Sequence, residues 1–587
     1  MKKVLIIIIA VLVCAAGAAV YWFVFHKDLS GKIIIPYIAH QKPRIDPHVP
    51  SPIPIADKLD EVVFDGLFNV SANPSGITYE DGLGELLGVD AKTSVVTVRL
   101  KQGKKWHSSW GVTMDKNKAT VAPKQDNVFS AQDLKFTLHR IQKLGSLSPD
   151  YILVSQAIPN FDFSGPDANN EIKFQFKGDR DWKEPDIKEV LSFKIIPANS
   201  EMDAPAYTVG TGPYLLTGEY EDVIYFQKMP DGIAHIADFI LKPFIDNSTY
   251  TTELRNRNIN TLLSTPFGAV SSILGDSTKF FHKSSIATCF FAVLFNVERL
   301  NLQQRLALRK LINNQIVMNR FFKMSSQQQR HIANYKGEGD NYAEYLNNSV
   351  FPTTSYYVEE QVVTPDTLRE GPDPSVLPDT VRIQTCLNYD FKEELSDLVE
   401  IMNDPGMFHG KVKVSAVGND DIKKQAYDAV LVAISGYRSN FLFDLFPIFL
   451  REPDFEGYKI NFRTVADAKG KESADPSCFT ASKNFFRLDL SAASPEQADF
   501  KLLLDYIYNF MSTREVSDKQ HYSQVLDQLD QKVALGSWLF SLPSLAYFST
   551  QFDDKSIDLY GTASQLSTVE KWLESPKKQG LMSFIKK

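Results

Sequence analysis

A chain of 587 residues is too long for one hydrophobic core, so two or three domains are expected. Its 63 basic and 71 acidic residues give a net charge of −8, which argues against a nucleic-acid binder, because such proteins present a basic surface. The four cysteines have no CxxC spacing, so neither a metal ribbon nor a disulfide framework is indicated.

The N-terminus carries the clearest single signal. After the opening MKK, the stretch from Val4 to Phe25 contains no charged residue, and a helix of that length crosses the roughly 30 Å hydrocarbon core of a bilayer. The leading lysines favour the cytoplasmic side. We therefore predict one transmembrane helix, a signal anchor within residues 1–27. The bulk of the chain then lies outside the cytoplasmic membrane, in the periplasm or extracytoplasmic space.

A signal peptide that is cleaved near Ala19 is the rival interpretation, since CAAGAA offers the small residues that a cleavage site needs. Cleavage there would leave the apolar sequence VYWFVF as the new terminus, which favours the uncleaved anchor. A lipoprotein interpretation of Cys14 is weaker, because the preceding Val13 is larger than the residue a lipobox requires.

The chain after the anchor alternates between strand and helix patterns. A β-run at Lys32–Ile35 precedes a proline-rich stretch, which is extended and irregular because each proline fixes φ and lacks an N–H. A helix is predicted from Ala56 onward, and alternating apolar and polar residues predict a strand over 94–107. Residues 130–145 predict a helix that begins at a Ser cap and ends at a glycine.

The segment YTVGTGPYLLTGEY, residues 207–220, raises the question of a phosphate-binding loop. Pro213 has no N–H to offer a phosphate, and the residues after it alternate like a strand and do not open a helix. We therefore predict a turn that leads into a strand. Further along, 286–297 predicts a buried strand and 300–322 one long amphipathic helix.

Residues 374–435 show strand and helix patterns in the order βαβαβ, which predicts a parallel sheet covered by helices. The last of these strands, YDAVLVAIS, is followed by the polar side chains of GYRSN. Ligands bind beyond the carboxyl ends of parallel strands, so a pocket is expected at this loop. A plain surface loop is the alternative. Candidate linkers are 334–345 and 364–379.

Motifs of catalysis are missing from the sequence. There is no HExxH, GxSxG, Walker A or CxxC motif, and no strand is followed by GxGxxG at the start of a helix. His107 is a candidate general base, but no His, Cys or carboxylate lies near it in sequence, which favours a structural role. We therefore expect a protein that is not an enzyme and has no catalytic residue, metal or cofactor.

Seven motifs follow one another along the chain. They are RIDPH (44–48), VVFDGLF (62–68), VVTVRLKQGKKWH (95–107), FSAQDLKFTLHRI (129–141), VGTGPYLL (209–216), LFNVERLNLQQRLALRKLINNQ (294–315) and YDAVLVAISGY (427–437). In this order, and over residues 33–550, they resemble the large substrate-binding proteins of peptide-type ABC importers, which bind oligopeptides, dipeptides or nickel.

The resemblance implies a two-lobe α/β fold, that of type II periplasmic binding proteins of the large peptide-binding kind, after the transmembrane helix. Lobe one would comprise residues 32–63, 197–290 and 538–587. An extra subdomain, 64–196, would be inserted into lobe one, and lobe two would span 291–537.

The resemblance also implies a ligand between the two lobes. The implied contacts are Tyr437, Arg438, Ser439 and Asn440 from lobe two, and from lobe one Ile53 and, as a weaker candidate, Tyr151. Peptide binders of this family carry an aspartate where Asn440 stands, and it neutralises the ammonium group of the peptide. Asp444 could replace it only in a rebuilt loop. Ile434 stands where some members have a basic residue, and the insertion at 108–129 is longer than usual.

The leading hypothesis is therefore a membrane-anchored substrate-binding component of an ABC importer. It would act as a monomer, bind a peptide or peptide-like solute and deliver it to an ABC permease in the cytoplasmic membrane. The alternative is an envelope scaffold or sensor of the same fold, which binds a partner protein or a non-peptide solute without transport. An envelope hydrolase has no motif to support it.

Overall fold

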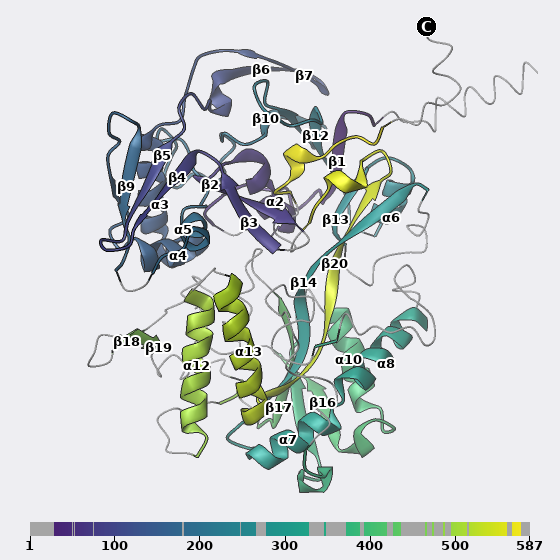
Figure 1. The fold of residues 1–587 in the computed structure, drawn as a ribbon. Coiled ribbons are helices and arrows are strands. Elements are labelled where there is room, and N and C mark those ends of the chain that lie inside the picture. Colours follow the sequence, from purple (N-terminus) through teal and green to yellow (C-terminus); the bar gives the residue numbers. More distant parts are fainter. Residues whose placement is uncertain are drawn as a thin grey trace, which may run out of the picture.

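In the computed structural model the chain forms two lobes joined by two long strands (Figure 1). The structure describes residues 29–49, 51, 53–73, 76–178, 181–246, 248–265, 278–327, 346–347, 371–387, 392–418, 426–435, 464–466, 472–474, 485–487, 495–512, 516–559 and 566–576. The predicted anchor at 1–27 and the predicted linker at 334–345 lie outside these residues. Among the described residues, no helix is long and apolar enough to cross a membrane.

Lobe one is built on a four-stranded sheet of order β1-β12-β11-β10. These strands are β1 (Lys32–Ile38), β10 (Tyr214–Tyr220), β11 (Val223–Lys228) and β12 (Asp238–Phe244). Helix α2 (Pro54–Val63) shares their core and begins two residues before the predicted start, because proline fits the first turn of a helix. The predicted turn at 207–220 does lead into a strand, β10.

A subdomain of lobe one has its own core and its own sheet, of order β4-β5-β9-β8. The strands are β4 (Gly84–Asp90), β5 (Val95–Leu100), β8 (Phe163–Ser164) and β9 (Glu171–Gln175), and the helices are α3 (Ala131–Leu144), α4 (Pro149–Ala157) and α5 (Glu184–Val190). The Ser cap predicted at the start of α3 is present, as part of a capping box of Ser130 with Asp133. The strand predicted over 94–107 is shorter, because a turn follows β5.

Two β-hairpins extend this subdomain. They are β2 (Phe68–Asn73) with β3 (Gly76–Asp81), and β6 (Trp110–Asp115) with β7 (Lys118–Pro123). The second hairpin forms most of the insertion at 108–129 and contacts β10 of lobe one. Gly218 of β10 leaves room there for Met114, whose Cγ lies only 3.0 Å from the place of a Cβ.

The sheet of lobe two continues into lobe one, with six strands in the order β13-β20-β14-β17-β15-β16. The strands are β13 (Thr261–Thr265), β14 (Phe280–Phe295), β15 (Val381–Thr385), β16 (Val412–Ala416), β17 (Ala429–Ser435) and β20 (Gly536–Ser549). Strands β15, β16 and β17 are parallel, as the βαβαβ pattern predicted. The buried strand predicted at 286–297 is part of β14.

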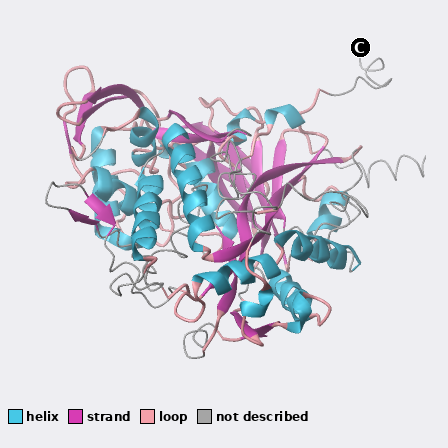
Figure 2. Cartoon of the chain, turned by 60° about the horizontal axis from the view of Figure 1, so that its bottom comes forward, coloured by secondary structure: helices cyan, strands magenta, loops and turns pink. Residues whose placement is uncertain are grey.

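Helices surround these strands (Figure 2). They are α6 (Tyr250–Arg255), α7 (Leu302–Leu311), α8 (Asn314–Gln327), α10 (Lys392–Asn403), α12 (Gln497–Ser512) and α13 (Val516–Val533). The short strands β18 (Thr464–Ala466) and β19 (Glu472–Ala474) form a separate pair. Single 3-10 turns occur at His107–Ser109, Gly145–Leu147, Pro374–Val376, Phe408–Gly410, Asp554–Ser556 and Val569–Lys571.

The prediction of one long helix over 300–322 is wrong, because two helices, α7 and α8, occupy this stretch. The break falls at Ile312 and Asn313, where the backbone of Ile312 leaves the helical region. The side chain of Asn313 accepts a hydrogen bond from the N–H of Ile316 at 3.1 Å. An asparagine in this role caps a new helix, and the apolar periodicity alone does not reveal it.

Candidate functional site

The carboxyl end of β17 lies at the junction of the two lobes. Strand β14 pairs with β20 alone from Phe280 to Ser285, and with both β17 and β20 from Cys289 onward. Ser435, the last residue of β17, stands opposite Cys289. Strand β17 therefore ends at the level where the two long strands pass into lobe one.

The pairing of the long strands is irregular at this junction. The register between β14 and β20 shifts between Ser285 and Cys289. Pro543 lies on β20 at this level, and a proline has no N–H to give to a sheet. A sheet with fewer ladder hydrogen bonds bends more easily, so we expect the lobes to move relative to each other about this point.

The four predicted ligand contacts of lobe two, Tyr437, Arg438, Ser439 and Asn440, lie outside the described residues, as does Asp444. The structure does show the end of β17 at Ser435, two residues before Tyr437. The expectation that a pocket forms beyond this strand therefore stays a prediction.

Ile53 lies at the cap position of α2, with extended backbone and a half-buried side chain. Its N–H donates to the Oγ of Ser51 at 3.1 Å, and its carbonyl accepts from the N–H of Ala56 at 2.9 Å. The N–H of Ser51 in turn donates to Asp57 at 2.7 Å. These bonds fix the extended segment against the first turn of α2, so Ile53 has a defined position at the surface of lobe one.

Tyr151 lies in α4 and packs against the core of the subdomain. Its ring stacks on Phe161, with 5.2 Å between the ring centroids and 15° between the planes. One face of the Tyr151 ring therefore packs inside the subdomain. Ile53 lies at the start of α2 in lobe one, whereas Tyr151 packs on the core of the inserted subdomain.

His107 is a buried structural residue. Its Nε2 donates to the carbonyl of Gly212 at 3.0 Å, and its Nδ1 accepts from the N–H of Gly210 at 3.2 Å. Burial lowers the pKa of His107, in keeping with a neutral imidazole that donates with one nitrogen and accepts with the other. The imidazole therefore holds the 207–220 turn in place.

The two glycines of this turn are needed for close packing. A Cβ on Gly210 would come within 1.8 Å of the carbonyl oxygen of Val63, and one on Gly212 within 2.5 Å of the carbonyl carbon of the same residue. The N–H of Gly212 donates to Val63 at 3.0 Å. The turn therefore uses its N–H groups within the protein, against the end of α2, which agrees with the rejection of a phosphate loop.

An ion pair within lobe one explains two of the seven motifs. Arg140, buried in α3, donates to both carboxylate oxygens of Asp46 at 3.0 and 2.7 Å and to Nδ1 of His48 at 2.6 Å. Its guanidinium also lies over the ring of Tyr207, 4.5 Å from the centroid. RIDPH and FTLHRI are thus partners in one buried network. The sequence showed both motifs but not their pairing, because the residues lie 94 positions apart.

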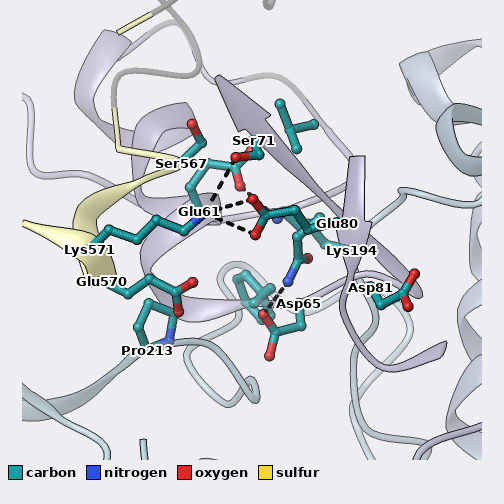
Figure 3. A pocket seen from close by; sticks show the side chains of 13 residues that line it. Glu61, Asp65, Ser71, Glu80, Asp81, Lys194, Pro213, Ser567, Glu570 and Lys571 are labelled. Atoms are coloured by element: carbon teal, nitrogen blue, oxygen red, sulfur yellow. Dashed lines mark hydrogen bonds and ion pairs between the residues drawn. The ribbon is translucent and has the colours of Figure 1, made fainter. Parts of the chain in front are cut away.

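A pocket of about 70 Å³ lies between α2, the β2–β3 hairpin and the C-terminal residues 567–571 (Figure 3). Most of its charges are paired. Lys571 donates to both oxygens of Glu80 at 2.7 and 2.9 Å, and Lys194 donates to Glu61 at 2.7 Å. Sequence analysis missed this pocket, because its lining comes from four separate parts of the chain.

Glu570 differs from the other acids of the pocket. It makes no hydrogen bond or ion pair with any residue that the structure describes. Burial raises its pKa, and the neighbouring charges of Asp65 and Glu80 raise it further. For Glu80, partial burial is outweighed by hydrogen bonds from Lys571 and Ser71, so its pKa is lowered. The pocket is best described as an ion-pair network that holds the hairpin to the C-terminal segment.

A metal centre is not evident in the described part of the chain, where no group of three or more His, Cys, Asp or Glu side chains could hold an ion.

Comparisons with known proteins identify the fold. The chain matches no protein-family model, and no curated protein is a significant sequence relative. Solved structures do match. The ABC transporter substrate-binding protein CtaP from Listeria monocytogenes has a TM-score of 0.60 and 13% identity, with 93% of this chain and 100% of that chain covered.

Two further similar structures carry bound ligands. The oligopeptide-binding protein AppA from Bacillus subtilis, solved with a nonapeptide, has a TM-score of 0.54 and 12% identity, covering 93% of this chain and 99% of that one. NikZ from Campylobacter jejuni, solved with Ni(L-His), has a TM-score of 0.56 and 14% identity, covering 93% and 100%. The chain therefore has the two-lobe fold of the substrate-binding proteins of peptide and nickel ABC transporters, as its motifs indicated.

Proposed function

We propose that this chain is the membrane-anchored, extracytoplasmic substrate-binding component of an ABC importer. It binds a peptide or peptide-like solute between its lobes and delivers it to a permease. It acts as a monomer and performs no chemistry of its own. The observation that carries the proposal is the fold, which extends over nearly the whole length of several substrate-binding proteins.

The sheet topology supports binding between the lobes. Strand β17 ends at the irregular junction of β14 and β20, so the residues after it start where two moving bodies would meet. We take lobe one as 32–63, 197–290 and 538–587, its inserted subdomain as 64–196, and lobe two as 291–537. Closure about the junction would bury a ligand and create the form that a permease recognises.

The proposed contacts to the solute are Ile53 and Tyr151 on the side of lobe one, and Tyr437, Arg438, Ser439 and Asn440 on the side of lobe two. An asparagine accepts a hydrogen bond from an ammonium group without supplying a negative charge. A peptide-like solute without a free amino terminus therefore suits Asn440 better than a common peptide does.

Native mass spectrometry on the full-length chain, gently purified from its own cells in detergent, tests which solute is carried. A discrete added mass that fragments into amino acids supports a peptide ligand. A non-peptide mass keeps the binding function and rejects the peptide. A protein without bound ligand that also gives no thermal shift against broad panels of peptides and metabolites contradicts the proposal. That outcome favours the scaffold alternative, which the predicted anchor and the asparagine at position 440 also support.

Closure is tested by energy transfer between one dye on each lobe. Ile245, whose side chain is 86% exposed after β12, and Lys413, exposed on β16, are suitable positions for cysteine. The solute should increase the transfer efficiency. A pair with both dyes in lobe one, at Ile245 and Lys555, serves as the control and should not respond. A solute that binds without any change in the first pair would contradict a mechanism of lobe closure.

Asn440→Asp tests the predicted amine contact. The exchange should tighten binding of a peptide with a free amino terminus by roughly tenfold, because a charge-assisted hydrogen bond is about twice as strong as a neutral one. The same peptide with an acetylated amino terminus is the matched control and should gain nothing. Equal effects on both peptides would remove Asn440 from the amine site.

A further inference from the structure

The folded part of lobe one begins directly after the predicted anchor. Leu29 is buried, with 6% of its surface exposed, in a core cluster with Ile34 and Phe280. Its carbonyl accepts hydrogen bonds from the N–H of Lys32 and from Nε2 of Gln551, both at 3.2 Å. Leu29 is therefore fixed in the fold.

The segment between the apolar stretch and the fold is very short. Phe25 is the last residue of the uncharged stretch, and only His26, Lys27 and Asp28 separate it from Leu29. Four peptide steps span at most about 14 Å, even when fully extended. If residues 4–25 cross the membrane, the surface around Leu29 must lie within that distance of the lipid headgroups.

The surface around Leu29 belongs to the end of lobe one that is remote from lobe two. The N–H of Thr550, just after β20, donates to the carbonyl of Lys279, just before β14, at 2.8 Å. The other ends of these strands lie in lobe two, and β14, with 16 residues, is about 50 Å long. Figure 1 shows β1 near the lobe-one ends of β13 and β20, away from lobe two.

We call this surface the anchor pole and define it as residues 29–32, 278–280, 549–556 and Glu574. Glu574 ties the pole together, since it accepts a hydrogen bond from the N–H of Gly31 at 2.5 Å. The charged side chains of the anchor pole are Lys32, Lys279 and Lys555 against Asp553, Asp554 and Glu574. The charges balance, so no net negative charge keeps the pole away from anionic headgroups.

We propose that the anchor pole rests against the lipid headgroups, so that lobe one is held at the membrane while lobe two is the lobe that swings. The proposal rests on the membrane anchor of the proposed function. The physical reason for this contact is the short tether of residues 26–28, which is too short to let lobe one move away from the bilayer.

Fluorescence quenching in proteoliposomes tests the contact. In the full-length chain, with its four native cysteines replaced by serine, a dye is attached at Lys555→Cys on the anchor pole. A second variant carries it at Lys413→Cys on β16 of lobe two. Both lysines are exposed, and the exchanges are matched. Spin-labelled headgroup lipids should quench the dye at position 555 several-fold more than the dye at 413.

Lengthening the tether provides a second test. An insert of roughly 20 Gly and Ser residues between Lys27 and Asp28 has an end-to-end distance of about 25 Å. The insert should abolish most of the quenching at position 555 while the chain stays in the membrane after alkaline carbonate extraction.

The outcomes separate the two proposals. Release of the chain by carbonate would contradict the predicted transmembrane anchor and therefore also the proposed contact of the anchor pole with the membrane. A chain that resists carbonate but shows equal quenching at 555 and 413, or quenching unaffected by the insert, overturns only the anchor pole. Solute-dependent closure, measured in the same proteoliposomes, would leave the proposed receptor function standing in that case.

Discussion

At the scale of single residues, His107 is buried and Glu570 is half-buried, and their surroundings shift the two pKa values in opposite directions. Two backbone groups of the 207–220 turn satisfy His107 in its neutral form. Glu570 stands near two other carboxylates and makes no ion pair in the described part of the chain. The stability of the protein should therefore respond to pH with opposite signs at the two sites.

His107→Gln should lower the free energy of unfolding by about 2 kcal/mol at neutral pH, because a buried N–H or carbonyl of the turn loses its partner. The pKa of His107 is lowered from 6.5, so its contribution is complete above pH 6.5 and is lost as the pH falls through the folded-state value. Denaturant titrations should show the difference from wild type shrinking towards pH 5. His139→Gln, at an exposed position, should change little, and a pH-independent difference at His107 would contradict the assignment.

Glu570→Gln should raise the free energy of unfolding at pH 8 by roughly 0.5 kcal/mol, because it removes a like charge next to Asp65 and Glu80. The pKa of Glu570 is raised from 4.5, so the stability linked to its proton is complete below pH 4.5 and is lost as the pH rises through the folded-state value. The advantage of the variant should therefore disappear in acid. Glu201→Gln, at an exposed site, is the control that should show no such trend.

At the scale of elements, a buried ion pair fixes α13 against α7 in lobe two. Arg309 donates to both oxygens of Asp530 at 3.0 and 3.1 Å, and both side chains are only 4% exposed. Trp538 on β20 donates to the same carboxylate at 2.8 Å. One aspartate thus joins two helices to one of the strands that connect the lobes.

Asp530→Asn should destabilise the protein by about 3–5 kcal/mol, because it leaves the buried guanidinium of Arg309 without a counter-charge. Asp499→Asn is a matched exchange in the neighbouring pair with Lys532, whose lysine is 63% exposed, and should cost less than about 1 kcal/mol. Urea unfolding of both variants measures the difference. Similar losses for the two would mean that the buried pair does not hold α13 in place.

At the scale of the whole molecule, both ends of the described chain fold into lobe one. Trp572, fully buried, packs edge-on against Phe548 of β20, with 5.4 Å between the centroids. Two residues later, Glu574 accepts the N–H of Gly31 near the start of the chain. The C-terminal segment therefore completes the lobe that the N-terminal strand begins.

Trp572→Ala should lower the free energy of unfolding by about 3–5 kcal/mol, as expected for removal of a large buried aromatic side chain. Leu573→Ala, next to it but 38% exposed, should cost far less. In calorimetry, the loss should appear in the unfolding transition of lobe one, which includes the end of β20. If Trp572→Ala leaves that transition unchanged, the C-terminal segment is not part of the core of lobe one.

Local elements and the resemblance to a family could be predicted from the amino-acid sequence. The cap of α3, the strand after GTGPY and the parallel strands of lobe two depend on residues close together in the chain, whose preferences local physics sets. The contacts between those elements became known from the three-dimensional fold. It paired Arg140 with Asp46, turned His107 into a support for the turn, assembled the pocket at Glu570 and brought the end of β17 to the junction of the lobes. These contacts join residues far apart in sequence, and no local preference encodes which distant partner a buried charge or strand end will meet.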